Sequence, residues 1–199
     1  MDITVEQIKE LREITGAGVL DAKKALIAAE GNMDKAVDAL REKGLARMAK
    51  RADRTANEGI IEMYAHLANR VGVMLELNSE SDFVARTDLF RNLAHEIALH
   101  IAAMDPKYLS REDVPRDEID RELEVLRAQA LAEGKPEQVV ERIVSGRLEK
   151  FYQENVLLEQ PFVKDDSKTV KDLIDDVTVQ LGENIVLRRF VRYELGEAI

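Results

Sequence analysis

The spacing of apolar residues along the first 45 positions predicts three short helices. The first helix has its apolar residues on one face and a cap at Thr4 or Asp2. The second and third helices are expected at about 19–30 and 33–43, where alanine is frequent and a glycine follows each helix. Three helices of this length form a minimal bundle, which is only marginally stable by itself.

The apolar pattern changes its period after residue 58. Across residues 59–78, apolar and polar positions alternate in two stretches that are separated by Ala68-Asn69-Arg70. This alternation buries one face of each strand, so the segment 59–78 predicts a β-hairpin. A third strand is expected at 184–195, which is rich in Ile, Val, Phe and Tyr.

Four further helices are predicted after the hairpin. The first, at about 87–104, has apolar residues at every fourth position. Two strongly helical stretches, 115–133 and 136–155, each begin with a proline, which the first turn of a helix accepts. The last helix, at about 170–182, is expected to have Thr169 as its cap.

Together these elements predict an α+β fold, in which a helical head precedes a small antiparallel sheet covered by helices. The stretch 46–57 is basic and poor in apolar residues, and it separates the two parts either as a linker or as a solvated extension of the preceding helix. We therefore expect a domain boundary there, with a three-helix head and its basic linker at 1–54 and an α+β core at 55–199.

Composition narrows the class of protein. The chain has no cysteine, which excludes disulfides, thiol nucleophiles and cysteine-ligated metals. Its formal net charge of −10 disfavours tight binding to a phosphate backbone, although the segment 41–54 is locally basic. The sequence shows neither a signal peptide nor the ~18 apolar residues of a membrane span. We expect a cytoplasmic protein whose partner is another protein, without membrane binding or direct contact with nucleic acid.

Nothing in the sequence is typical of an enzyme. The three histidines are His66, His95 and His100, and the last two are five residues apart, a spacing that does not place them together on one helical face. The sequence contains no metalloprotease, P-loop, dinucleotide-binding or nucleophile-elbow motif. We therefore expect no catalytic residue, no metal site and no cofactor.

Two loops are better candidates for a binding site. The first is the glycine-rich turn 15–18, followed by Lys23 in the next helix. It is either a plain turn between helices with exposed lysines, or a docking surface where a partner approaches the backbone. The residues themselves leave both alternatives open.

The second candidate is the polar loop 80–86, which contains Phe83. In one alternative, Ser81 or Asp82 caps a helical turn and Phe83 packs back into the core as a hydrophobic staple. In the other, Phe83 is an exposed anchor beside the Asp82 carboxylate, and aromatic anchors often dominate protein interfaces. The residues do not decide between these alternatives.

Several long stretches, in the right order, resemble the elongation factor Ts family. They are LREITGAGVLDAKKAL at 11–26, ELNSESDFVAR at 76–86, LLEQPFV at 157–163, SKTV at 167–170 and RFVRYELGE at 189–197. The family usually has threonine at the position of Ser81, and this exchange keeps the hydroxyl group. The resemblance covers the whole chain.

The resemblance implies a guanine-nucleotide exchange factor that binds elongation factor Tu·GDP and promotes GDP release by disturbing its Mg²⁺ site during translation elongation. Such a factor performs no covalent chemistry. The implied Mg²⁺-dislocation loop consists of Ser81, Asp82, Phe83 and Val84, and the implied head contacts are Gly16, Ala17, Gly18 and Lys23. An adaptor that resembles ubiquitin-associated domains, binds proteins and lacks exchange activity is the alternative.

The resemblance also implies a head similar to ubiquitin-associated three-helix domains. Longer members of the family have a second core half, a coiled-coil projection and a C-terminal helical module, which this short chain is expected to lack. A second copy of the chain would then supply the missing core half, so the resemblance implies a homodimer. Whether the segment 160–163 serves the partner interface or the dimer stays open.

Overall fold

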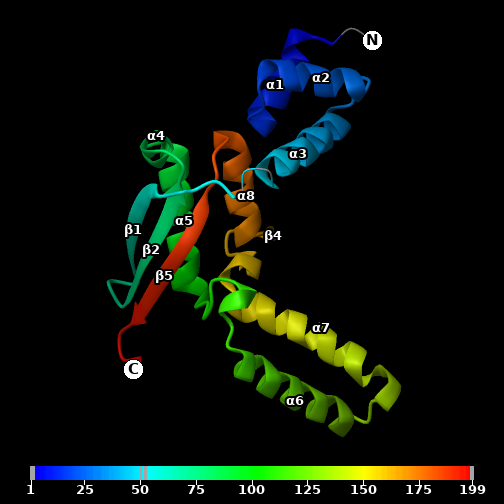
Figure 1. Ribbon diagram of the computed structural model, residues 1–199, viewed down its shortest axis with the longest axis vertical. Coiled ribbons are helices and arrows are strands. Elements are labelled where there is room, and N and C mark those ends of the chain that lie inside the picture. The colour runs from blue at the N-terminus through cyan, green and yellow to red at the C-terminus, as the bar shows by residue number, and fades with distance from the viewer. Residues whose placement is uncertain (1–2, 50, 52, 198–199) are drawn as a thin grey trace. The chain divides into compact units, whose positions relative to one another are not determined.

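The computed structural model describes residues 3–49, 51 and 53–197 (Figure 1). The chain forms two compact units, and each unit is assembled from separate stretches of sequence. Unit 1 contains Met1–Ile60, Leu77–Leu93 and Ile174–Arg188. Unit 2 contains Ile61–Glu76, Ala94–Leu173 and Arg189–Ile199. The proposed division into domains 1–54 and 55–199 stays a prediction.

Three helices begin unit 1, as the apolar pattern predicts. They are α1 (Val5–Thr15), α2 (Val19–Ala28) and α3 (Met33–Ala49). Thr4 and Gln7 form a capping box, in which each side chain accepts a hydrogen bond from the other residue's amide. The helices share a core of Leu11, Ala22, Ala25, Leu26, Ala36 and Leu40. Because α3 runs past the predicted end at residue 43, residues 46–49 follow the helix-extension alternative.

The strands form one three-stranded sheet in the order β1-β2-β5 (Figure 1). They are β1 (Glu58–His66), β2 (Val71–Ser79) and β5 (Val186–Glu194), which confirms the predicted hairpin and third strand. Helix α5 (Asp88–Met104) covers one face of the sheet within unit 2. There, His95 on α5 lies 3.0 Å from the Glu62 carboxylate and edge-on to the Tyr64 ring.

The opposite face of the sheet carries exposed apolar side chains within unit 2. We call this set the outer sheet face, and it consists of Ile61, Met63, Met74, Val191 and Tyr193. Met63 is 72% exposed and Tyr193 is 73% exposed. On the same face, the Arg189 Nε donates a hydrogen bond to the Glu76 carboxylate at 2.8 Å. No element among the described residues of unit 2 buries this face.

Helices α6 (Arg116–Ala132) and α7 (Glu137–Asn155) lie side by side in unit 2 as an antiparallel pair (Figure 1). Pro115 and Pro136 precede their first turns, which confirms the predicted starts. Their shared core contains Leu126, Ala130, Val140 and Val144. The sequence predicts both helices, at 115–133 and 136–155, and the structure packs them against each other.

Shorter elements complete the chain. They are α4 (Asp82–Ala85), the 3₁₀ turns η1 (Arg111–Asp113) and η2 (Leu157–Glu159), the strands β3 (Pro161–Phe162) and β4 (Asp165–Thr169), and α8 (Val170–Leu181). β3 and β4 form a small antiparallel pair. Thr169 caps α8 as predicted, since its hydroxyl accepts a hydrogen bond from the Asp172 amide at 3.1 Å.

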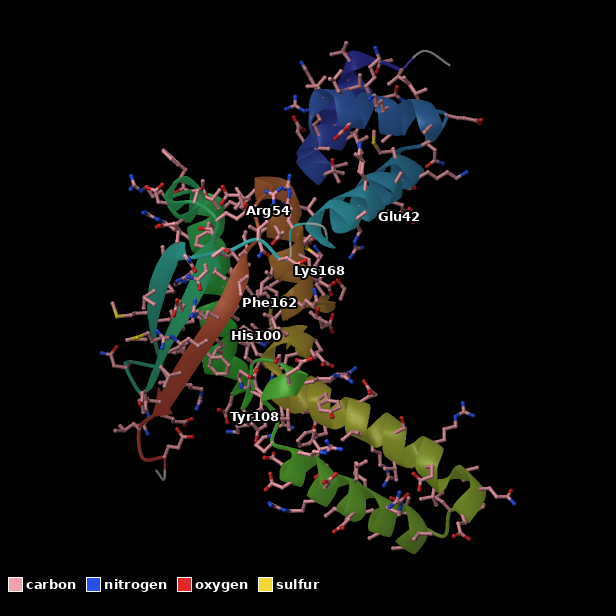
Figure 2. The ribbon with its side chains drawn as sticks, viewed as in Figure 1. Glu42, Arg54, His100, Tyr108, Phe162 and Lys168 are labelled. Atoms are coloured by element: carbon pink, nitrogen blue, oxygen red, sulfur yellow. The ribbon has the colours of Figure 1, made fainter. Side chains whose placement is uncertain are left out.

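Two residues of the segment 160–163, Gln160 and Phe162, lie in the interior of unit 2, whereas Pro161 and Val163 are exposed. Figure 2 shows His100 beside Phe162, with 5.9 Å between their ring centroids. The Val163 amide donates to Nδ1 of His100 at 3.1 Å, so the ring donates through Nε2 to the side-chain oxygen Oε1 of Gln160 at 2.9 Å. Gln160 and Phe162 are buried, and these contacts give the segment a role inside the unit.

Among the helices within residues 3–49 and 53–197, none combines the length and the hydropathy that a bilayer-spanning segment requires.

Candidate functional site

The loop after β2 contains a single helical turn, α4, which presents Phe83. Ser81 is the N-cap of this turn, and its hydroxyl accepts a hydrogen bond from the Val84 amide at 3.4 Å. After the turn, the Thr87 hydroxyl donates to the Val84 carbonyl at 2.8 Å. Ala85 is buried and anchors the turn to unit 1. The predicted group 81–84 therefore lies together on one capped turn.

Phe83 is 79% exposed, the largest exposed fraction among the described large apolar side chains. The hydrophobic-staple alternative is therefore wrong, although its other half, the Ser81 cap, is correct. Beside the ring, the Asp82 carboxylate accepts a hydrogen bond from Arg86 at 2.6 Å. Burying a phenylalanine side chain in a partner releases about 1.5 to 3 kcal/mol, so this exposed ring is suited to an interface.

Carboxylates from two distant parts of the sequence hold the loop. Ser81 donates from its amide and from its hydroxyl to the two oxygens of Glu183, at 3.0 and 2.7 Å. In return, the Glu80 carboxylate accepts a hydrogen bond from the Asn184 amide at 2.7 Å. We call this arrangement the crossed carboxylate pair. The sequence analysis missed it, because residues about a hundred positions apart show no pattern that links them.

The turn between α1 and α2 is ordered by its own side chains. Gly16 ends α1 in the left-handed conformation, with φ 65°, which glycine adopts without strain. The Thr15 hydroxyl donates to the Leu11 carbonyl at 2.6 Å, and the Arg12 Nε donates to the Ala17 carbonyl at 3.2 Å. This leaves the predicted residues Gly16, Ala17 and Gly18 on one firm turn, next to the exposed Lys23.

Apolar side chains near this turn extend the candidate surface. Ile14, Val19 and Leu20 are 57%, 50% and 73% exposed. The sequence analysis did not select them, yet a signal was present: each is apolar, and none is needed for the inward stripe that Leu11, Ala22 and Leu26 form. Exposed apolar residues gathered around a turn are typical of a docking surface.

The described residues contain no group of three histidine, aspartate or glutamate side chains arranged to hold a metal ion. Shifted pKa values occur chiefly at structural hydrogen bonds. The Asn184 amide holds the pKa of Glu80 below its usual value, and Arg54 acts in the same direction. The hydrogen bond to Glu118 raises the pKa of Tyr108 to about 12. Both shifts have their main cause in hydrogen bonds within the fold.

Comparison with known proteins gives matches along almost the whole chain. The family model described as "Elongation factor TS" matches residues 4–197. "Elongation factor Ts" of Thermoanaerobacter sp. (strain X514) is 59% identical over 197 residues, which cover 99% of this chain and 97% of that protein. The protein of the same name from Caldanaerobacter subterraneus subsp. tengcongensis is also 59% identical, with 99% and 98% covered. That of Moorella thermoacetica is 58% identical, with 99% and 97% covered.

Proposed function

Because the chain belongs to the elongation factor Ts family, we propose that it is a guanine-nucleotide exchange factor for elongation factor Tu during translation elongation. The proposed factor binds elongation factor Tu·GDP and speeds GDP release. It makes and breaks no covalent bond, so it is not an enzyme in the chemical sense. The proposal assigns it to the cytoplasm and requires no cofactor, membrane or direct contact with nucleic acid.

The exposed ring of Phe83 is the observation that carries the proposal. A phenylalanine that is 79% exposed buries little apolar area in its own fold and so contributes little to its stability. Here the ring is held on a turn with a cap at Ser81 and a hydrogen bond at Thr87, so its position is fixed before a partner arrives. Pre-arranged aromatic anchors reduce the entropy lost on binding.

The exchange mechanism follows from linkage between two ligands of the GTPase. A factor that binds the nucleotide-free GTPase more tightly than the GDP form must weaken GDP binding by the same ratio. This requires a contact that forms only when the nucleotide site is distorted. In the proposal, Phe83 makes that contact by inserting between helices of the GTPase domain, with Asp82 beside it.

The effect on GDP is indirect in this proposal. Helices displaced by Ser81 to Val84 disturb the Mg²⁺ site of elongation factor Tu. Losing Mg²⁺ removes charge compensation from the β-phosphate, and GDP then dissociates faster. The chain itself needs no metal ligand for this role.

The α1–α2 turn is proposed as the second contact with the same GTPase. In the turn Gly16 to Gly18, a partner helix would approach the backbone closely at Gly18, where nothing lies within 4 Å of the position of a Cβ, whereas Gly16 packs against the Gln180 side chain. Lys23 supplies a positive charge for an acidic partner surface, and Ile14 and Leu20 supply apolar area. This contact would anchor the factor while Phe83 acts on the nucleotide site.

The outer sheet face supports the proposed homodimer. Five apolar side chains from neighbouring strands gather on one face of a sheet, while α5 covers the other face. Most sheets of this size bury both faces or carry polar residues on the open one. A second copy of the chain would cover this face with an identical apolar surface, which a two-fold arrangement permits.

The decisive experiment measures release of fluorescent GDP from elongation factor Tu, with and without the protein. The wild-type protein should speed release, and Phe83→Ala should slow factor-dependent release by about thirtyfold or more, which corresponds to the 2 kcal/mol or more of an interface hot spot. Unchanged release with Phe83→Ala would show that the ring is not the wedge.

Leu131→Ala is the matched control for Phe83→Ala. Leu131 is also a large exposed apolar residue, on α6, and the proposal gives it no contact with the GTPase. Its substitution should leave GDP release unchanged. Circular dichroism melting curves of both variants would check that neither change disturbs the fold.

A further inference from the structure

The crossed carboxylate pair connects the Phe83 loop to the segment after α8 through reciprocal hydrogen bonds. Each of the two acidic residues accepts the backbone amide of the residue that follows the other acid in sequence. Glu183 accepts from the Ser81 amide, and Glu80 accepts from the Asn184 amide. All of these residues belong to unit 1. The two segments are therefore joined by two hydrogen bonds, and each segment supplies one donor and one acceptor.

Glu183 also fixes the direction of the Ser81 hydroxyl. A carboxylate only accepts hydrogen bonds, so the hydroxyl hydrogen must point towards Glu183 Oε1, 2.7 Å away. The lone pairs of the hydroxyl are then free to face the Val84 amide, which donates to it at 3.4 Å. Hydrogen bonds in such a chain polarise and strengthen one another. Glu183 thus reinforces the cap of the turn that carries Phe83.

Arg54 contacts both residues of the other hydrogen bond, Glu80 and Asn184. Its guanidinium donates to the Glu80 carboxylate at 3.3 Å, and its carbonyl oxygen accepts from the Asn184 side chain at 2.9 Å. Figure 2 labels Arg54 where the chain leaves the helical head. Glu80 therefore has a cationic hydrogen-bond partner, whereas Glu183 accepts its two hydrogen bonds from the neutral residue Ser81. Hydrogen bonds from neutral donors to a charged acceptor are stronger than those between neutral groups.

We propose that Glu183 is a positioning residue, which holds the Phe83 loop in its binding geometry without touching the partner. This inference rests on the proposed exchange function for its biological meaning, but the order of the loop is measurable in the free protein. Without Glu183, the amide of Ser81 loses its acceptor and the cap loses its direction. The loop would then sample other conformations, and only the fraction in the capped form would bind.

The first test measures amide hydrogen exchange in the free protein, with NMR as the method of detection. The useful probes are the amides of Ala85 and Thr87. They donate hydrogen bonds to the backbone carbonyls of Ser81 and Val84, and not to Glu183. Glu183→Ala should speed their exchange about tenfold, if the lost interaction has the size of a charge-assisted hydrogen bond. Glu124→Ala, an exposed acid on α6, removes the same charge and should leave these amides unchanged. Unchanged Ala85 and Thr87 exchange in Glu183→Ala would overturn the inference.

Conservative variants separate the hydrogen bonds from the charge. Glu183→Gln keeps an oxygen for the Ser81 amide, but its amide group donates to the Ser81 oxygen and no longer accepts the hydroxyl hydrogen, so it should restore only part of the protection. Ser81→Ala keeps Glu183 and the backbone amide but removes the hydroxyl, and it should speed exchange by a smaller factor, about threefold. These variants also decide the matter if Glu183→Ala does not fold, because equal exchange rates in Glu183→Gln, Ser81→Ala and the wild type would contradict a directional cap.

The second test is GDP release at increasing concentrations of each variant. A positioning role predicts that Glu183→Ala raises the half-saturating concentration by the factor by which the capped fraction of the loop falls, while the rate at saturation stays within about twofold, since the bound loop is the same. A lower saturating rate with an unchanged half-saturating concentration would mean that Glu183 acts on the partner directly. If the wild-type protein releases no GDP, the proposed function fails, and the hydrogen-exchange result still decides whether Glu183 holds the loop.

Discussion

His100 carries an ionisable ring inside unit 2, where water does not reach it. Burial lowers the pKa of His100 below its ordinary value, and the hydrogen bond to Gln160 opposes this only in part. The Val163 amide already donates to Nδ1, so a second proton on the ring would face another donor. The neutral ring therefore belongs to the folded state, and protonation favours unfolding.

The resulting prediction concerns stability against pH. Because the pKa of His100 is lower in the folded than in the unfolded chain, the unfolded chain binds more protons below about pH 6.5. The His100 contribution to the free energy of unfolding is therefore complete above that pH and is lost as the pH falls, by at most about 1.4 kcal/mol per pH unit. His100→Gln, which keeps a donor and an acceptor but does not titrate, provides the comparison.

Urea unfolding of both proteins from pH 7.5 to 5.0 measures this contribution. The wild type should lose its advantage over His100→Gln as the pH falls through the acid part of this range. An advantage that stays constant over the whole range would show that the ring does not titrate differently in the two states.

Sequence reasoning at the level of residues was partly sufficient. It predicted the cap at Thr169 and gave Thr4 and Asp2 as alternatives for the first helix, because caps depend on neighbours three positions away. Thr4 is the cap in the structure, and Asp2 lies outside the described residues. It left two alternatives for Phe83, since a single aromatic in a polar loop has no periodicity that tells inward from outward. It gave no indication of Glu183 at Ser81, because that contact is formed only by the tertiary structure.

The positions of the secondary-structure elements were more predictable from the sequence than which face of each element is buried. The alternation at 59–78 correctly predicted the hairpin, but β1 has apolar residues at both parities, such as Ile60 and Ile61. A shift of one residue exchanges the two faces of a strand, so alternation cannot choose between them when both are apolar. The structure turns Glu62 and Tyr64 towards α5 and leaves Ile61 and Met63 outside.

Gly59 gives a prediction for the same hairpin. Its φ is 147°, and a Cβ atom there would lie 2.1 Å from the Leu77 carbonyl oxygen on β2. Gly59→Ala must therefore push the two strands apart, and we expect it to lower the free energy of unfolding by about 2 to 3 kcal/mol. Gly72→Ala is the matched control within the hairpin, since a Cβ at Gly72 meets nothing within 4 Å.

Chemical denaturation of both glycine variants would measure the difference. Gly72→Ala should be within about 0.5 kcal/mol of the wild type, as is usual for open surface positions. Equal stability of Gly59→Ala and Gly72→Ala would show that the strands do not approach as closely as described.

For the whole molecule, the proposed homodimer makes the oligomeric state depend on the outer sheet face. A charged residue in the middle of an apolar interface is desolvated without a partner, which strongly disfavours association. We expect the wild type to have twice the chain mass of 22.5 kDa, and Met63→Lys to shift it to a single chain. Sedimentation equilibrium over a range of protein concentrations would measure the masses.

Leu131→Lys provides the control for the dimer. It places the same charge at another exposed apolar position, on α6, and should leave the mass unchanged. A wild type with the mass of one chain, or a dimer that survives Met63→Lys, would show that copies of the chain do not associate through this face.

The discontinuous make-up of both units has a consequence for synthesis of the protein on the ribosome. Each unit takes its last stretch from the C-terminal part of the chain, from residue 174 onward for unit 1 and from residue 189 onward for unit 2. Folding during translation usually proceeds domain by domain from the N-terminus. In this chain, the hairpin and α5 emerge long before β5, which pairs with β2. The nascent sheet therefore has an unpaired β2 edge until β5 leaves the exit tunnel, and chaperones have their longest opportunity to act in that interval.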